Sequence, residues 1–351
     1  MKPLVISIVA ACLSAAATVS PAANEAGPAP PDEFAEIAPL ASRSLLLDAA
    51  MAGSRMVIVG ERGHVLLSDD QGKAWRQARV PTRATLTGVF FLDAQHGWAV
   101  GHDEVILRSE DGGETWTRTH FAPEKEQPLL DVWFADADNG FAFGAYGTIL
   151  ASHDGGRSWA EQIFEPHPLV EKPQAANSPE SNGESKDDYD VEASVSDMHL
   201  NAVSPATDGK LFLAAEAGHL FRSDDSGASW LELPSPYEGS FFGVLPLDPP
   251  SVLAYGLRGH LFRSDDAGAT WRALPVQTTA MLTNGLRLDA QTVVVTGLAG
   301  TLLVSRDGGQ SFQLLAQEDR KGLAAALAAA TSLVTAGEAG IKIIALPAAA
   351  P

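Results

Sequence analysis

Short runs of apolar residues recur along the chain, and clusters of Gly, Asp and Ser separate them. In one stretch the runs are Leu86–Phe91, Gly97–Gly101, 105–109 and 115–118. Each of these runs has the length of a strand and is too short to form an amphipathic helix. The pattern therefore predicts antiparallel hairpins, four strands to a unit, and an all-β fold.

An octapeptide, Ser-x-Asp-x-Gly-x-x-Trp, precedes the fourth strand of six units, with Phe in place of Trp in the last copy. We expect the Asp to accept hydrogen bonds from backbone N–H groups two residues on, and the Gly to supply a positive φ. Metal ligands or catalytic acids are the alternative, but a ring of repeats needs such a site once rather than six times. The residues assigned to this structural turn are Asp70, Asp111, Asp154, Asp225, Asp266 and Asp307, with Trp75, Trp116, Trp159, Trp230, Trp271 and Phe312.

A second motif, Gly-x-x-Gly before an apolar run, sets the period of the repeat. Its first positions are Gly60, Gly101, Gly144, Ala215, Gly256, Gly297 and Gly337, at steps of 41, 43, 71, 41, 41 and 40 residues. Four strands in about 41 residues are typical of a propeller blade. A single blade cannot bury both faces, so neighbouring blades must pack together. We predict a single domain at 34–347, a seven-bladed β-propeller with four-stranded antiparallel blades.

The seventh unit shows strand patterns at 323–327, 332–335 and 341–346, with no fourth strand after them. Residues 34–40 form a spare apolar segment before the first unit. We predict that this N-terminal strand completes blade 7 and fastens the ring. The alanine-rich tract at 323–330 favours a helix by propensity, but the repeat period favours a strand there.

The first 23 residues have the layout of a signal peptide, with Lys2 before an apolar run and small residues after it. We expect cleavage of 1–23 and export of the mature chain to the periplasm. Cys12 stands in a sequence that loosely resembles a lipoprotein box, so a lipid anchor there is an alternative. No other stretch has the roughly 18 apolar residues that span a bilayer, and we expect no transmembrane segment in the mature chain.

The net charge of the chain limits the classes of partner that it is expected to bind. The chain has 24 Lys and Arg against 44 Asp and Glu, a formal charge of -20, which disfavours binding to nucleic acid. Its single Cys excludes a disulfide scaffold and a Cys-rich metal site. We assign no cofactor, no metal site and no catalytic residue. Residues 165–197, between units three and four, hold nine acidic residues and two Lys, and we predict that this acidic insertion is disordered.

The six octapeptides are similar to Asp-boxes, also called BNR repeats. Together with the unit length and the Gly-x-x-Gly hairpins, they make the chain resemble the photosystem II stability/assembly factor family over about 34–347. This resemblance implies an exported propeller that binds a membrane-protein intermediate and performs no catalysis. Asp-boxes also occur in sialidases, so a glycoside hydrolase is the alternative, although the Arg-Ile-Pro sequence typical of sialidases does not occur here.

The candidate binding residues lie in turns that share one face of the predicted ring. In a propeller, the turns between the second and third strands lie beside the connections between blades, and here their sequences vary from unit to unit. We therefore interpret the chain as a monomeric, non-enzymatic scaffold whose protein partner is a membrane-protein complex. The candidate contact residues are Arg62, Arg83, Tyr146, Tyr237 and Arg258.

Overall fold

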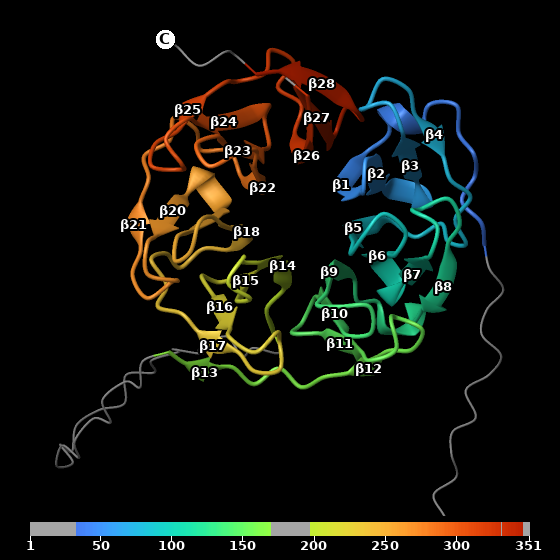
Figure 1. Ribbon diagram of the computed structural model, residues 1–351, viewed down its shortest axis with the longest axis horizontal. Coiled ribbons are helices and arrows are strands. Elements are labelled where there is room, and N and C mark those ends of the chain that lie inside the picture. The colour runs from blue at the N-terminus through green and yellow to red at the C-terminus, as the bar shows by residue number, and fades with distance from the viewer. Residues whose placement is uncertain (1–32, 170–196, 331, 347–351) are drawn as a thin grey trace, which may run out of the picture. The chain divides into compact units, whose positions relative to one another are not determined.

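The computed structural model describes residues 33–169, 197–330 and 332–346. These residues form seven sheets arranged around one axis, as Figure 1 shows. Single turns of 3-10 helix connect some of the strands, and this part of the chain has no α-helix. The chain is a seven-bladed β-propeller, which confirms the predicted all-β class and the number of blades.

The strands of each blade are called a to d here, from the axis outward, and a, b, c and d are antiparallel neighbours in blades 1 to 6. Strands a are β1 (Leu46–Ala52), β5 (Leu86–Phe91), β9 (Leu129–Phe134), β14 (Leu200–Pro205), β18 (Phe241–Pro246), β22 (Leu282–Arg287) and β26 (Leu323–Ala329). Strands b are β2 (Arg55–Gly60), β6 (Gly97–Gly101), β10 (Gly140–Gly144), β15 (Leu211–Ala215), β19 (Val252–Gly256), β23 (Val293–Gly297) and β27 (Ser332–Gly337). Strands c are β3 (Val65–Ser68), β7 (Ile106–Ser109), β11 (Ile149–Ser152), β16 (Leu220–Ser223), β20 (Leu261–Ser264), β24 (Thr301–Ser305) and β28 (Lys342–Ala345). Strands d are β4 (Arg76–Gln77), β8 (Thr117–His120), β12 (Ala160–Glu161), β17 (Leu231–Glu232), β21 (Arg272–Ala273) and β25 (Gln313–Leu314).

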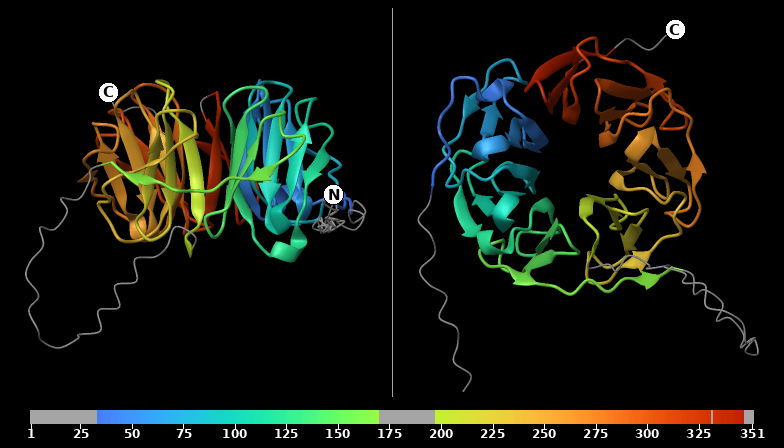
Figure 2. Two further views of the ribbon diagram at one scale, coloured as in Figure 1. Left: turned by 90° about the horizontal axis from the view of Figure 1, so that it is seen from below. Right: turned by 180° about the vertical axis from the view of Figure 1, so that it is seen from behind.

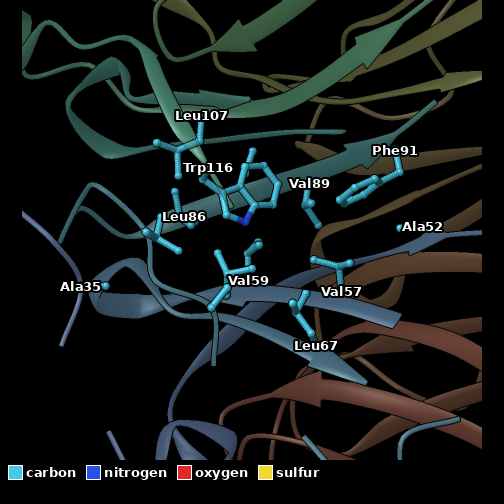
Figure 3. Packing of buried hydrophobic residues seen from close by; sticks show 14 of the residues in the cluster. Ala35, Ala52, Val57, Val59, Leu67, Leu86, Val89, Phe91, Leu107 and Trp116 are labelled. Carbon is cyan, nitrogen blue, oxygen red and sulfur yellow. The ribbon is translucent and has the colours of Figure 1, made fainter. Parts of the chain in front are cut away.

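Strands b are the most deeply buried elements. Every residue of β6, β10, β15, β19 and β23 is buried, because both faces of these strands pack against other side chains. This explains why their sequences are continuous apolar runs instead of alternating ones. Figure 3 shows one seam between blades, where the ring of Trp116 in blade 2 lies among Leu86, Leu107 and, from blade 1, Val59.

The Asp-box forms the turn between strands c and d in the same way in all six copies. The Ser hydroxyl accepts a hydrogen bond from the Gly N–H at 2.8–2.9 Å and donates one to the Asp carboxylate at 2.7–2.9 Å. The carboxylate also accepts a backbone N–H at 2.8–3.0 Å, and the donor lies four residues on, not two as expected from the sequence. The Gly has a φ of +79° to +92° in each copy, where a side chain would be strained.

Backbone hydrogen bonds place the two kinds of turn on opposite faces. In all seven blades the first residue of the b–c turn donates its N–H, at 2.8–3.1 Å, to the carbonyl of a residue just before strand a. Four Asp-box turns instead donate to the turns that join strands a and b, as Gly112 does to Gln95 at 2.9 Å. The b–c turns and the connections that enter strands a therefore share a face, called the b–c face below, and the Asp-boxes lie on the other.

Blade 7 differs from the prediction. Its sheet has three strands, β26, β27 and β28, and residues 34–40 do not pair with it. The expected N-terminal strand of blade 7 is therefore wrong. Ala35 donates its N–H to the Val80 carbonyl at 2.9 Å, and the Glu36 carbonyl accepts from the Gln77 side chain at 2.8 Å, so the segment follows the outer edge of blade 1.

The ring is closed by the residues that come next. In the 3-10 turn η1 (Ala41–Arg43), the carbonyl of Ser42 accepts a hydrogen bond from the backbone N–H of Ile341 at 2.9 Å. Ala41 and Leu46 are buried in one cluster with Val334 of blade 7. The N-terminal segment thus fastens blade 7 to blade 1 by a turn and apolar contacts. The alanine-rich tract forms β26, as the repeat period predicted.

The start of the acidic insertion is ordered, which corrects part of the prediction for 165–197. His167–Pro168 forms β13, a fifth strand of blade 4 that runs parallel to β17. Figure 2 shows this segment crossing from blade 3 to blade 4 on the outside of the ring. Phe164 holds it there, because its ring lies 5.0 Å from that of Phe221. The rest of the insertion, 170–196, lies outside the described residues, as do the predicted signal peptide at 1–23 and Cys12.

Candidate protein-binding face

The b–c turns hold side chains in an unusual backbone conformation. The second residue of the turn has a φ of +52° to +62° in six blades, and it is never glycine. This left-handed conformation costs a non-glycine residue about 1 kcal/mol or more. The six residues are Arg62, Asp103, Tyr146, Ala217, Arg258 and Ala299. Three of them, Arg62, Tyr146 and Arg258, are exposed and carry large side chains that are candidates for binding.

Arg83 lies in the connection from blade 1 to blade 2 and is exposed. Its side chain donates to the Phe34 carbonyl at 3.2 Å and forms an ion pair with Glu36 at 3.4 Å. Both acceptors belong to the N-terminal segment on the edge of blade 1. Arg83 therefore helps to hold that segment in place, and the carboxylate of Glu36 partly neutralises its positive charge.

Tyr146 is 54% exposed, and its ring meets the ring of His199 edge-on at 5.3 Å. His199 is fixed in turn by Glu216, whose carboxylate accepts the His199 backbone N–H at 3.1 Å and lies 3.5 Å from the imidazole Nδ1. This arrangement presents an aromatic surface beside a carboxylate where blades 3 and 4 meet. Such a surface suits a partner side chain that is both apolar and basic.

Tyr237 and Arg258 lie close to the same pocket on blade 5. The Tyr237 ring is 4.1 Å from the ring of His260 and 6.2 Å from that of Phe241. Beside His260 is an open pocket of about 340 Å³. Its lining consists of Arg258, Gly259, His260, Leu261, Ala273, Leu274, Pro275, Val276 and Thr278.

Glu104 is a group that the sequence analysis did not single out. It replaces the second glycine of the b–c turn in blade 2, has a φ of +47°, and is completely buried. Its carboxylate lies 3.0 Å from the imidazole of His120 and 3.2 Å from the amino group of Lys125, which also pairs with Glu161. Burial alone would raise the pKa of Glu104, but the hydrogen bonds from His120 and Lys125 outweigh burial and lower it.

Two further carboxyls, Asp48 on β1 and Asp131 on β9, lie between strands a near the axis. Asp48 accepts the N–H of Val89 in the next blade at 2.8 Å, and Asp131 accepts that of Val203 at 2.8 Å. Burial raises the pKa of each carboxyl to about 7, and the charge of Asp48 contributes to the increase for Asp131. Their contacts tie adjacent blades together.

The five candidate contact residues all lie on the b–c face or in its connections, but they do not form one cluster. In the described part of the chain, no hydrogen bond, ion pair or ring contact joins any two of them. His199 and His260 were missed, although both neighbour a predicted tyrosine in space. The only sequence signal for His260 was its place after the second glycine of the turn, which it shares with His64 and His219.

The described residues contain no group of three or more His, Cys, Asp or Glu side chains that could hold a metal ion. Within the same ranges, no helix is long and apolar enough to cross a bilayer.

Comparison with known proteins supports the sequence resemblance. Residues 67–128 match the family described as "Photosynthesis system II assembly factor YCF48". "Photosystem II stability/assembly factor HCF136, chloroplastic" from Cyanidioschyzon merolae is 35% identical over 95 residues, which are 25% of this chain and 22% of that protein. "Photosystem II assembly protein Ycf48" from Thermosynechococcus vestitus is 40% identical over 42 residues, 12% of each chain. The alignments thus span less than a quarter of these curated relatives.

Among solved structures, "YCF48 bound to D1 peptide" has a TM-score of 0.66 and 16% sequence identity, and the match covers 91% of this chain and 98% of the other. "YCF48 from Cyanidioschyzon merolae" has the same TM-score and identity, covering 89% and 98%. At this identity the likeness shows the fold alone. The repeats, the sequence matches and the ring together show that this chain is a seven-bladed propeller similar to the photosystem II stability/assembly factors.

Proposed function

We propose that the mature chain is exported to the periplasm and works there as a non-enzymatic scaffold for assembly of a membrane-protein complex. Its partner docks on the b–c face and no bond is made or broken. The names of the matched relatives support an assembly role. The peptide named with one structural neighbour supports a polypeptide as the bound partner. The signal-peptide layout of the first 23 residues supports export.

The observation that carries the proposal is the left-handed backbone of the b–c turns. Arg62, Tyr146 and Arg258 have φ values of +57°, +55° and +57°, where glycine would be free of strain. A fold selected for stability alone gains from glycine at such positions, because a strained side chain is retained at a cost. The fold does not require long side chains at these turns, since Ala217 and Ala299 occupy equivalent positions, and contact with a partner gives the three long side chains a use.

The test is a crosslinking pull-down from native membranes with a triple variant, Arg62→Gly, Tyr146→Gly and Arg258→Gly. Glycine suits the positive φ of each turn, so the variant removes three side chains without straining the ring. The matched control is Ala217→Gly with Ala299→Gly, which changes the equivalent turns but removes only methyl groups. We expect wild type and control to recover the same membrane protein and the triple variant to lose it.

Recovery of the same partner by the triple variant, or of no membrane protein by wild type, would overturn the proposal. The thermal unfolding of all three proteins is measured alongside, so that loss of binding is not mistaken for loss of fold. The glycoside hydrolase alternative is tested separately. Turnover of a sialoside or another reporter glycoside by the purified chain would contradict a non-enzymatic role.

A further inference from the structure

One residue of blade 7 is exposed although its counterparts in the other blades are buried or half-buried. Ile343, the second residue of β28, is 55% exposed. Ile343 lies opposite Val334 of strand b, and the residues opposite the same position of strand b in the other blades are buried or half-buried. These counterparts are Leu67, Arg108, Ala151, Arg222, Arg263 and Val304. The difference identifies a surface in blade 7 that the fold covers everywhere else.

The cause is the fourth strand, which blade 7 lacks among the described residues. In five other blades, a residue that follows strand d donates its N–H to the carbonyl of the first or second residue of strand c. The Leu274 N–H, for example, lies 2.8 Å from the Leu261 carbonyl. In blade 7, no described residue pairs with the outer side of β28. The outer edge of β28 therefore offers both an apolar side chain and backbone groups to an added strand.

The N-terminal segment that could have filled this edge is placed elsewhere. Ala35 is buried, and Ala35 and Glu36 form backbone hydrogen bonds with residues of blade 1. Ser42 is fixed to Ile341 at the b–c turn of blade 7. Residues 35–38 would have to leave blade 1 to reach β28. The described chain thus supplies no strand for this edge.

The chain's own strands d indicate the chemistry of the missing strand. In three blades an aromatic residue is followed three positions later by leucine, as in Trp230–Leu233, Trp271–Leu274 and Phe312–Leu315. Leu233 and Leu274 are 4% and 5% exposed, so this leucine fills a buried position. The formal charge of -20 disfavours a second copy of the same acidic chain and favours a basic partner.

We propose that the outer edge of β28 binds an extended segment of a basic partner protein, which adds as the fourth strand of blade 7 through an aromatic-x-x-leucine pattern. The bound segment covers Ile343 and pairs its backbone with β28. This site goes beyond the proposed function, because it lies on the outer rim of the ring and not on the b–c face. The test of this site also needs no partner from membranes. A negative result for the β28 site can therefore be distinguished from a negative result for the proposed docking on the b–c face.

The test uses a fluorescein-labelled peptide with the sequence of residues 268–276, Gly-Ala-Thr-Trp-Arg-Ala-Leu-Pro-Val. Fluorescence polarisation with the purified full chain measures its dissociation constant. We expect saturable binding to wild type that is weakened at least about tenfold by Ile343→Asp. Because Ile343 is exposed, this substitution leaves the fold intact. The matched control is Ile163→Asp, at a residue that is 80% exposed and remote from β28 in the sheet order.

A second peptide, N-methylated at the leucine, tests whether the backbone takes part. Methylation removes the N–H that Leu274 donates in blade 5, so strand addition predicts loss of binding. Absence of binding to wild type, equal binding to Ile343→Asp, or full binding of the methylated peptide would each overturn the proposal. Sedimentation that shows a dimer abolished by Ile343→Asp would identify a second copy as the occupant and would also overturn it.

Discussion

Replacement of Asp48 and Asp131 by Asn is expected to change how the stability of the ring depends on pH. Each carboxyl accepts a backbone N–H of another blade, and the amide oxygen of Asn accepts the same hydrogen bond. The substitution therefore removes only the capacity to ionise. Burial raises the pKa of both carboxyls to about 7 in the folded chain, against 3.8 for an ordinary Asp.

Proton linkage gives the direction in which the free energy of unfolding changes with pH. Below a pH of about 4, both carboxyls are protonated in the folded and the unfolded chain. Between pH 4 and 7 the unfolded chain has lost these protons while the folded chain keeps them, so the free energy of unfolding falls as pH rises. A pKa of about 7 instead of 3.8 corresponds to about 4 kcal/mol per carboxyl at pH 8. Both residues keep part of their surface exposed, and nearby water reduces the expected cost to about 2 kcal/mol each.

The assay is the free energy of unfolding by urea from pH 4 to pH 8 for wild type, Asp48→Asn, Asp131→Asn and the double variant. We expect all four to agree at pH 4. At pH 8 the double variant should be more stable by about 3 kcal/mol, or about 5 °C in Tm. Its gain should be less than the sum of the two single gains, because the charge of Asp48 contributes to the pKa of Asp131.

The control is Glu124→Gln, which removes one negative charge from an exposed 3-10 turn. It should follow the wild-type profile at every pH. Parallel profiles for wild type and the double variant between pH 4 and 8 would refute the reasoning, because they would show that the two carboxyls ionise in the folded chain at an ordinary pKa.

Two further predictions concern the Asp-box. Ser223→Ala removes a buried hydroxyl that donates to Asp225 and accepts the Gly227 N–H, so it should lower the free energy of unfolding by about 1–3 kcal/mol, measured in urea; an unchanged value would contradict a stabilising role for this turn. Ala74 stands where the other five copies have a Ser or Thr hydroxyl that donates to the Asp carboxylate at 2.6–2.7 Å. Ala74→Thr should therefore raise Tm by about 1 °C, and the gain should vanish when Asp70 is also replaced by Ala.

The repeat made most of the ring predictable from the sequence. The spacing of the first glycines gave the number of blades, and the repeat period correctly overrode the helical propensity of the tract that forms β26. Periodicity works here because each blade buries the same positions against its neighbours. An aromatic residue therefore recurs at the position of Trp116 in six of the seven repeats.

The exceptions to the repeat could not be predicted. The path of residues 34–40 depends on the Val80 carbonyl and the Gln77 side chain, which are distant in sequence and have no signal in a local pattern. The order of β13 depends on Phe164 and its contact with Phe221 in blade 4. Likewise, the proximity of His260 to Tyr237 results from the packing of a connection against blade 5, which spacing does not reveal.

The central claim is that a protein partner docks on the b–c face. Its most direct test is photocrosslinking in native membranes with benzoylphenylalanine placed at Tyr146, on that face, or at Ser226, in an exposed Asp-box turn on the other face. The two positions have matching φ values of +55° and +58°, so the probe meets similar backbone geometry in both. The account predicts a discrete adduct with a membrane protein from position 146 and none from position 226. An adduct from position 226 alone, or none from position 146, would contradict it.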